Sequence, residues 1–159
     1  MRNWIFFISV VLLLGGCISP KVSSQQSAKI VWKSSSLRYA DMGFISDSGD
    51  SMEIEIYGVG SPLMRLSISS NTICRGRLEC ISHREFYAKE LSSYYPKGLL
   101  ENIFRAEPIY SGMNLTKSSN GFTQKIKKSN RYEIEYRVST KQTIFRDTIN
   151  KILIKVIKI

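Results

Sequence analysis

Residues 52–68 read MEIEIYGVGSPLMRLSI and contain two runs in which apolar and polar side chains alternate. Alternation with a period of two is typical of antiparallel strands that bury one face and expose the other to water. Gly58, Gly60 and Pro62 separate the two runs, so the stretch predicts a hairpin. Glu53 and Glu55 would lie on its solvated face. The apolar positions of the hairpin are Met52, Ile54, Ile56, Met64, Leu66 and Ile68.

The same period recurs in residues 122–126 and 132–138, which predicts further antiparallel strands. Turn-forming residues stand at 47–50 and 118–121. The last strand, expected over 151–159, is the least regular. Its lysines at 151, 155 and 158 are expected to protect a sheet edge from pairing with other chains.

One segment changes to helical spacing. Ser82 followed by Glu85 is a capping-box signature, and Tyr94-Tyr95-Pro96 would stop the helix that it starts. A second short amphipathic helix is expected before Pro108. We therefore predict an α+β fold in which four or so strands, a helical insert and three or four strands form a curved antiparallel sheet. The sheet would be an open half-barrel with the insert as its lid. The apolar face of the lid helix would be Leu99, Leu100, Ile103 and Phe104.

The amino terminus reads as an export signal. Arg2 precedes an apolar run from Trp4 to Leu14 that is too short to span a bilayer. Leu14-Gly15-Gly16-Cys17 resembles the lipobox, in which the chain is cut before a cysteine that carries acyl chains. An ordinary signal peptide with a chance cysteine is the alternative. We expect a lipoprotein signal peptide over 1–16, a flexible tether over 17–28 and a single domain over 29–159. Cys17 is the predicted lipidation site.

Two further cysteines, Cys74 and Cys80, are separated by Arg-Gly-Arg-Leu-Glu. Disulfides persist in exported proteins, and Gly76 would let the chain turn between the two cysteines. A structural disulfide is the favoured interpretation. The spacing fits neither a zinc site nor a redox-active Cys-x-x-Cys pair, so no metal or cofactor is expected.

Catalysis is not visible in the sequence. His83 is the only histidine, and we expect it to be exposed at the start of a helix rather than to act as a base. No serine has an evident partner and no phosphate-binding loop is present, so we expect no enzyme. The chain carries a formal charge of +10. For an exported protein this favours anionic headgroups or an acidic protein as partner over nucleic acid, although a generally basic surface explains the charge equally well.

The order of elements resembles the LolB/LolA lipoprotein-localisation family. Residues 52–68 look like its central hairpin, and 96–108 resembles its helix of the form Pro-x-x-x-Leu-x-x-x-(Ile/Leu). The resemblance spans roughly 37–159 and implies an eleven-strand half-barrel whose helical lid encloses the acyl chains of incoming lipoproteins. It also implies a loop whose protruding leucine helps to insert those lipoproteins into the outer membrane. Val59 occupies the leucine's position here, flanked by Gly58 and Gly60.

The resemblance thus implies membrane lipid, lipoprotein acyl chains and a periplasmic carrier as partners of a monomer. Ile18, rather than aspartate, follows Cys17, which favours the outer membrane, facing the periplasm. Exposure at the cell surface stays open. Two other interpretations compete: a structural or interaction lipoprotein with a filled core, and a surface lipoprotein that binds host or envelope polymers. For Val59, the alternative to a protruding tip is a plain turn whose side chain folds back onto the core.

Overall fold

The computed structural model of the protein describes residues 24–159, which form one eleven-stranded antiparallel sheet and two short α-helices. The order of the strands in the sheet is β6-β5-β4-β3-β2-β1-β11-β10-β9-β8-β7. The elements in chain order are β1 (Ser24–Lys33), β2 (Arg38–Asp47), β3 (Met52–Gly58), β4 (Ser61–Ile68), β5 (Thr72–Arg75), β6 (Glu79–Ser82), α2 (His83–Glu90), α3 (Leu99–Arg105), the 3-10 turn η2 (Tyr110–Gly112), β7 (Leu115–Ser118), β8 (Gly121–Lys128), β9 (Tyr132–Ser139), β10 (Gln142–Asp147) and β11 (Ile152–Lys158).

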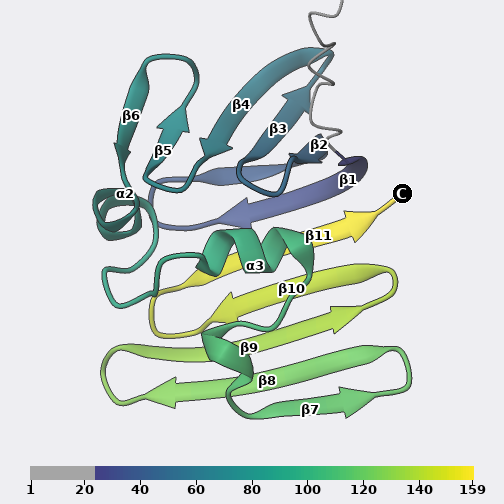
Figure 1. Ribbon diagram of the computed structural model, residues 1–159, viewed down its shortest axis with the longest axis vertical. Coiled ribbons are helices and arrows are strands. Elements are labelled where there is room, and N and C mark those ends of the chain that lie inside the picture. Colours follow the sequence, from purple (N-terminus) through teal and green to yellow (C-terminus); the bar gives the residue numbers. More distant parts are fainter. Residues whose placement is uncertain (1–23) are drawn as a thin grey trace, which may run out of the picture.

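The chain builds this sheet from its middle outward (Figure 1). Strands β1 to β6 run as a meander from the centre to one edge. The helices then carry the chain across the sheet to the other edge, and β7 to β11 return to pair with β1. The antiparallel sheet and the helical insert are as predicted. The strand count expected from the periodicity was too low, because six strands precede the helices and five follow them.

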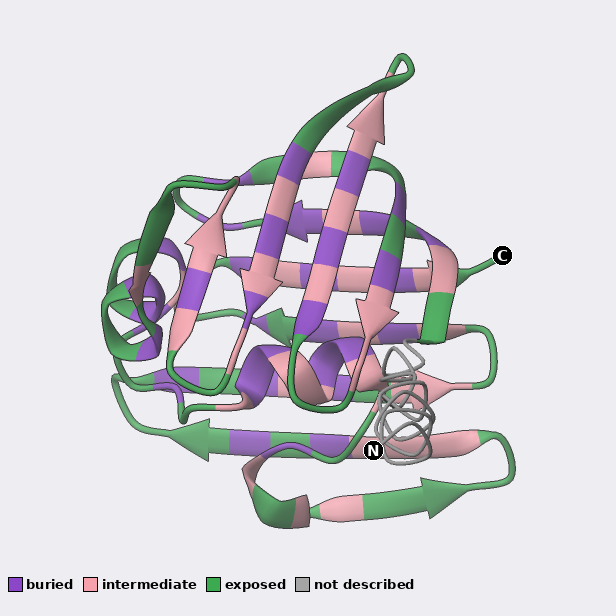
Figure 2. Cartoon of the chain, turned by 45° about the horizontal axis from the view of Figure 1, so that its top comes forward, coloured by how far each residue is buried: buried purple, intermediate pink, exposed green. Residues whose placement is uncertain are grey.

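One face of the sheet is buried beneath the helices, and buried residues alternate with more exposed ones along the strands (Figure 2). Helix α3 packs its apolar side against this face, where the ring centroids of Trp32 and Phe104 lie 5.8 Å apart. The main buried strand residues are Ala28, Ile30, Trp32, Ile45, Met52, Ile54, Ile56, Met64, Leu66, Ile68, Ile73, Ile126, Ile134, Tyr136, Phe145, Ile152, Ile154 and Val156.

Helix α2 begins at a local sequence signal, whereas α3 has no side-chain cap. The Ser82 hydroxyl accepts a hydrogen bond from the Glu85 backbone N–H at 3.2 Å, so the capping box is confirmed. Lys89 pairs with Glu85 one turn earlier at 2.8 Å. Helix α3 follows Gly98 and ends at Ala106, and both flanking residues have left-handed backbone conformations.

Two expectations about the strands are corrected. The tether expected over 17–28 overlaps β1, because residues 24–28 pair with β2 in register from Ser24↔Asp47 to Ala28↔Gly43. The remainder of that tether lies outside the described residues. The lysines of the last strand do not guard an edge, since β11 lies between β1 and β10 near the middle of the sheet. The edges are the four-residue strands β6 and β7.

Candidate functional site

The tip of the β3–β4 hairpin is the most unusual feature of the surface. Gly58 pairs with Ser61, which leaves Val59 and Gly60 as a two-residue turn with φ angles of +50° and +80°. Two left-handed residues are the requirement of a type I′ turn, which closes tight hairpins. The Val59 side chain is fully exposed, at 108% of its reference area, and Leu63 beside it is half exposed. The side chain therefore does not fold back onto the core.

Val59 is an unfavourable residue for this turn. A left-handed conformation brings Cβ close to the backbone, which is worst for a β-branched residue, and type I′ turns favour Asn-Gly. Burial does not compensate for this strain, since the side chain touches water on all sides. Strained residues that contribute nothing to packing are typical of functional sites. The position of Val59 thus makes the tip a candidate contact site.

The hairpin is braced below its tip. The pairing of β3 with β4 shifts register between Ile56 and Tyr57, as in a β-bulge. On the face opposite the core, Arg65 donates from Nε to Glu55 Oε1 at 2.7 Å, and the Tyr57 hydroxyl donates to Glu55 at 3.1 Å. Glu53 also pairs with Arg65, at 3.0 Å. Both glutamates lie on the face that the sequence predicted, in a structural ion-pair cluster.

A second candidate region is the rim of the buried face beneath α3. A cleft of about 360 Å³ opens there, and its apolar lining is Ile45, Met52 and Phe104. Arg105 of α3 spans the cleft and donates to both carboxylate oxygens of Asp47, at 2.6 and 2.9 Å. These hydrogen bonds hold the pKa of the Asp47 carboxyl below its ordinary value. The ion pair fastens the end of α3 to the end of β2.

The rest of α3 is tied to the sheet by its backbone. The Tyr136 hydroxyl donates to the carbonyl oxygens of Asn102 and Glu107 at 3.3 and 3.0 Å. The predicted apolar face of this helix is buried as a unit: Leu99, Leu100, Ile103 and Phe104 are each less than a tenth exposed. Beneath and beside it, aromatic rings occupy the space, including Tyr136 and Phe145 with centroids 6.4 Å apart.

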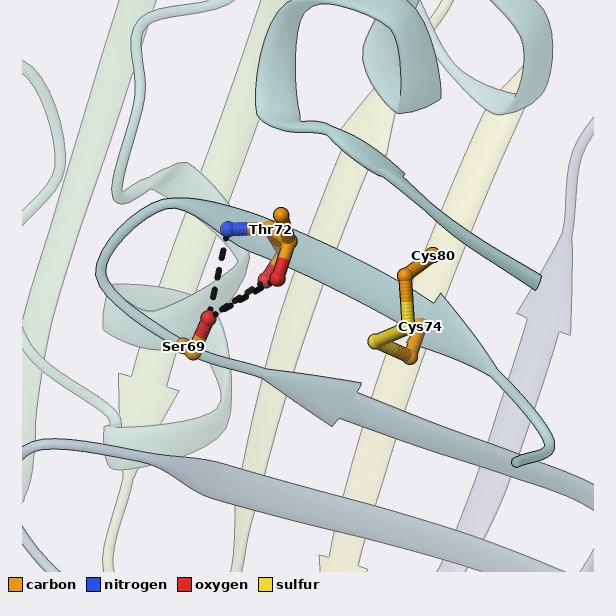
Figure 3. Close-up of a disulfide and its surroundings, with 4 residues drawn as sticks. All are labelled: Ser69, Thr72, Cys74 and Cys80. Atoms are coloured by element: carbon orange, nitrogen blue, oxygen red, sulfur yellow. Dashed lines mark hydrogen bonds between the residues drawn. A yellow bond between two sulfur atoms is a disulfide. The ribbon is translucent and has the colours of Figure 1, made fainter. Parts of the chain in front are cut away.

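Cys74 and Cys80 form a disulfide between β5 and β6 (Figure 3). They stand directly opposite each other in the strand register, next to the paired Ile73 and Ile81. Gly76, at φ +65°, begins the turn that brings them together. The bond fastens β6, a four-residue edge strand, to the sheet.

Replacing both Cys74 and Cys80 with serine is expected to lower the free energy of unfolding by about 2 kcal/mol, because the bond closes a short loop. The fold should persist, since the neighbouring Ile73 is fully buried in the core. Denaturant unfolding of the wild type and the double variant measures the difference. Alkylation without reductant should find no free thiol at either position; two free thiols would contradict the bond.

The expectation that His83 is exposed is wrong. The residue begins α2, but it is only 5% exposed, because its ring is enclosed between the β4–β5 turn and α3. Its Nε2 lies 2.7 Å from the Ser69 carbonyl oxygen, and its Nδ1 lies 4.0 Å from Glu101 Oε1 with no hydrogen-bond partner. This arrangement joins a turn and two helices.

Sequence reasoning missed the buried polar residues altogether. Asp147, 1% exposed, accepts hydrogen bonds from the Tyr95 hydroxyl and from three backbone N–H groups. Gln124, fully buried, bonds both the N–H and the C=O of Ile109. The partners that bury these two side chains, Tyr95 and Glu133 for Asp147 and Ile109 for Gln124, are 14 or more residues away and leave no local pattern. Over residues 24–159, no group of three or more His, Cys, Asp or Glu side chains could hold a metal ion.

The predicted lipidation site, Cys17, and the signal expected over 1–16 lie outside the described residues. Within the described part of the chain, no helix is long and apolar enough to cross a bilayer. Comparison of the chain with protein-family models, with curated proteins and with solved structures finds no match.

Proposed function

We propose that this protein is a lipoprotein of the outer membrane, anchored by acylated Cys17, that binds acyl chains and helps to receive or insert other lipoproteins, as LolB does. The observation that carries the proposal is the fully exposed Val59, held in a strained turn at the end of a braced hairpin. An apolar side chain that stabilises nothing in its own domain is suited to contact lipid.

The architecture supports the proposal. The resemblance to the LolB/LolA family implies eleven strands with a helical lid, and the sheet has eleven antiparallel strands with α2 and α3 inserted between β6 and β7. In this proposal the sheet acts as a half-barrel, α3 is the lid and the face beneath it receives acyl chains.

The rim cleft supplies an entry route. An acyl chain would pass between Ile45 and Met52 and displace Phe104 from Trp32, so that α3 must move outward. The ion pair of Arg105 with Asp47 would have to open for this movement. Arg105 and Lys158, which also line the cleft, would then be close to the anionic headgroup or ester end of the ligand.

The alternative is a structural or interaction lipoprotein with no lipid ligand. The close aromatic packing beneath α3 favours it, because Trp32, Tyr136 and Phe145 are fully buried and already fill the space that acyl chains would need. Mass spectrometry of lipid extracted from the purified protein separates the two functions. Bound acyl chains in addition to those on Cys17 support the receptor; their absence supports the alternative.

The decisive experiment replaces Val59 with glutamate in cells where the variant is the only copy. Lipoproteins should accumulate away from the outer membrane, because a charged tip does not enter the bilayer. The purified domain should keep its melting temperature, since exposed substitutions change stability by only about 0.5 kcal/mol.

The matched control is Ser119→Glu, which adds the same charge to the exposed β7–β8 turn and should leave sorting intact. Fractionation of the inner and outer membranes gives the readout. Normal sorting with a well-folded Val59→Glu protein would contradict the receptor function.

A further inference from the structure

A second apolar tip lies on the same side of the sheet as the first but is set back along the strands, because its turn bonds Arg65, six residues after Val59. The β5–β6 turn carries Arg77 and Leu78, and the Leu78 side chain is 94% exposed. Because the strands are antiparallel, the β3–β4 and β5–β6 turns end at the same side of the sheet, and both lie at the top of Figure 1. The sheet therefore presents Val59 and Leu78, two almost fully exposed apolar side chains, in one direction.

The second tip is held rigidly relative to the first. The Gly76 backbone N–H donates to the Arg65 carbonyl oxygen at 2.8 Å, which joins the β5–β6 turn to β4. The Cys74–Cys80 disulfide closes the same hairpin. Arg75 forms an ion pair with the largely buried Glu90 of α2. These three constraints hold Leu78 at the surface, although burial of its side chain would be favourable.

A groove of about 480 Å³ lies between the two hairpins. Its lining combines apolar side chains with three arginines: Tyr39, Pro62, Leu63, Met64, Arg65, Arg75, Gly76 and Arg77. Arg65 is engaged by Glu53 and Glu55, and Arg75 by Glu90. Arg77 is exposed and has no carboxylate partner among the described residues, although the exposed Glu79 follows two positions later. Within the part of the chain that the structure describes, one guanidinium without a carboxylate partner thus lies at the groove between the two tips.

We propose that this end of the sheet docks on a bilayer containing anionic phospholipid, with Val59 and Leu78 entering the interface and Arg77 binding a lipid phosphate at the groove. This inference rests on the proposed function, which supplies the membrane anchor at Cys17. Residues 17–23 span at most about 25 Å when fully extended, so a domain anchored at Cys17 stays close to a bilayer. Ser24 lies at the end of β3 opposite to Val59, because Ser24 pairs with Asp47 and Asp47 with Met52, so the tips reach the bilayer when the domain lies along it. Arginine matches phosphate geometry, and exposed apolar side chains beside basic ones are typical of interfacial binding.

The test places a fluorescent reporter at each tip. Leu78→Trp and Val59→Trp are introduced separately into the mature acylated protein, which is reconstituted in vesicles of phosphatidylcholine with or without phosphatidylglycerol. Brominated lipid quenches a tryptophan that enters the bilayer. The wild type gives the baseline, because Trp32 is fully buried, and Ser119→Trp in the distant β7–β8 turn is the matched control.

Quenching at both tips, strongest with phosphatidylglycerol and absent at Ser119→Trp, is the expected result. Adding Arg77→Gln to Leu78→Trp should lower the ratio of inserted to free tip about fivefold in anionic vesicles. The role of Arg77 would be overturned if quenching were equal in the two kinds of vesicle and Arg77→Gln did not change it. Quenching at Val59→Trp but not at Leu78→Trp would overturn the two-tip contact and leave the proposed function standing. Absence of quenching at both tips would contradict the two proposals together.

Discussion

Val59→Asn is expected to raise the free energy of unfolding by about 1 kcal/mol and, in the same protein, to abolish lipoprotein delivery. The gain follows from the backbone, because Val59 has φ +50° in a turn that prefers Asn-Gly, and a left-handed conformation costs an ordinary residue about 1–2 kcal/mol. The loss follows from the side chain, because asparagine presents an amide where the tip needs an apolar group. Denaturant unfolding measures the first effect and membrane fractionation the second.

The conservative variant Val59→Leu is the control for this pair of effects. Leucine keeps an apolar tip, so delivery should persist. Increased stability with unchanged delivery in Val59→Asn would mean that the valine has no role at the tip. Decreased stability would mean that Val59 does not have a left-handed conformation in this turn.

Asp147→Ala should lower the free energy of unfolding by roughly 3–5 kcal/mol, the largest effect that we expect from a single substitution. Its carboxylate is 1% exposed and accepts from the backbone N–H groups of Glu133, Ile149 and Asn150 at 3.0–3.3 Å. It also accepts from the Tyr95 hydroxyl at 2.5 Å. Removal of the carboxylate leaves these donors without an acceptor at the junction of β9, β10 and the loop that follows α2.

Tyr95→Phe is the matched control for Asp147→Ala, because it removes one donor and leaves the carboxylate with its other partners. We expect a decrease of about 1 kcal/mol. Thermal or denaturant unfolding of the two variants gives the comparison. A loss in Asp147→Ala no larger than that in Tyr95→Phe would show that water replaces the carboxylate.

The candidate site could be located from the sequence but not characterised by it. The flanking glycines marked Val59 as a tip, yet its exposure depends on whether any other element covers the hairpin. The second tip at Leu78 was missed, because a leucine in a turn carries no sign of burial or exposure. The pairing of Arg75 depends on α2, which brings Glu90 to it from fifteen positions along the chain. Among residues 24–159, Arg77 receives no such carboxylate partner.

The sequence by itself determined the elements whose signals are local. Alternation over 52–68 places one side of each strand in the core, the capping box starts α2 at His83, and the symmetry of Cys74 and Cys80 about their turn makes them opposite partners. Only the tertiary structure decided that residues 24–28, four of which are polar, form a strand, because β2 supplies the pairing that their own side chains do not favour. It also decided that β11 is central and that His83 is buried. Both depend on which distant segment arrives alongside, and backbone pairing and burial between distant segments leave no period in the chain.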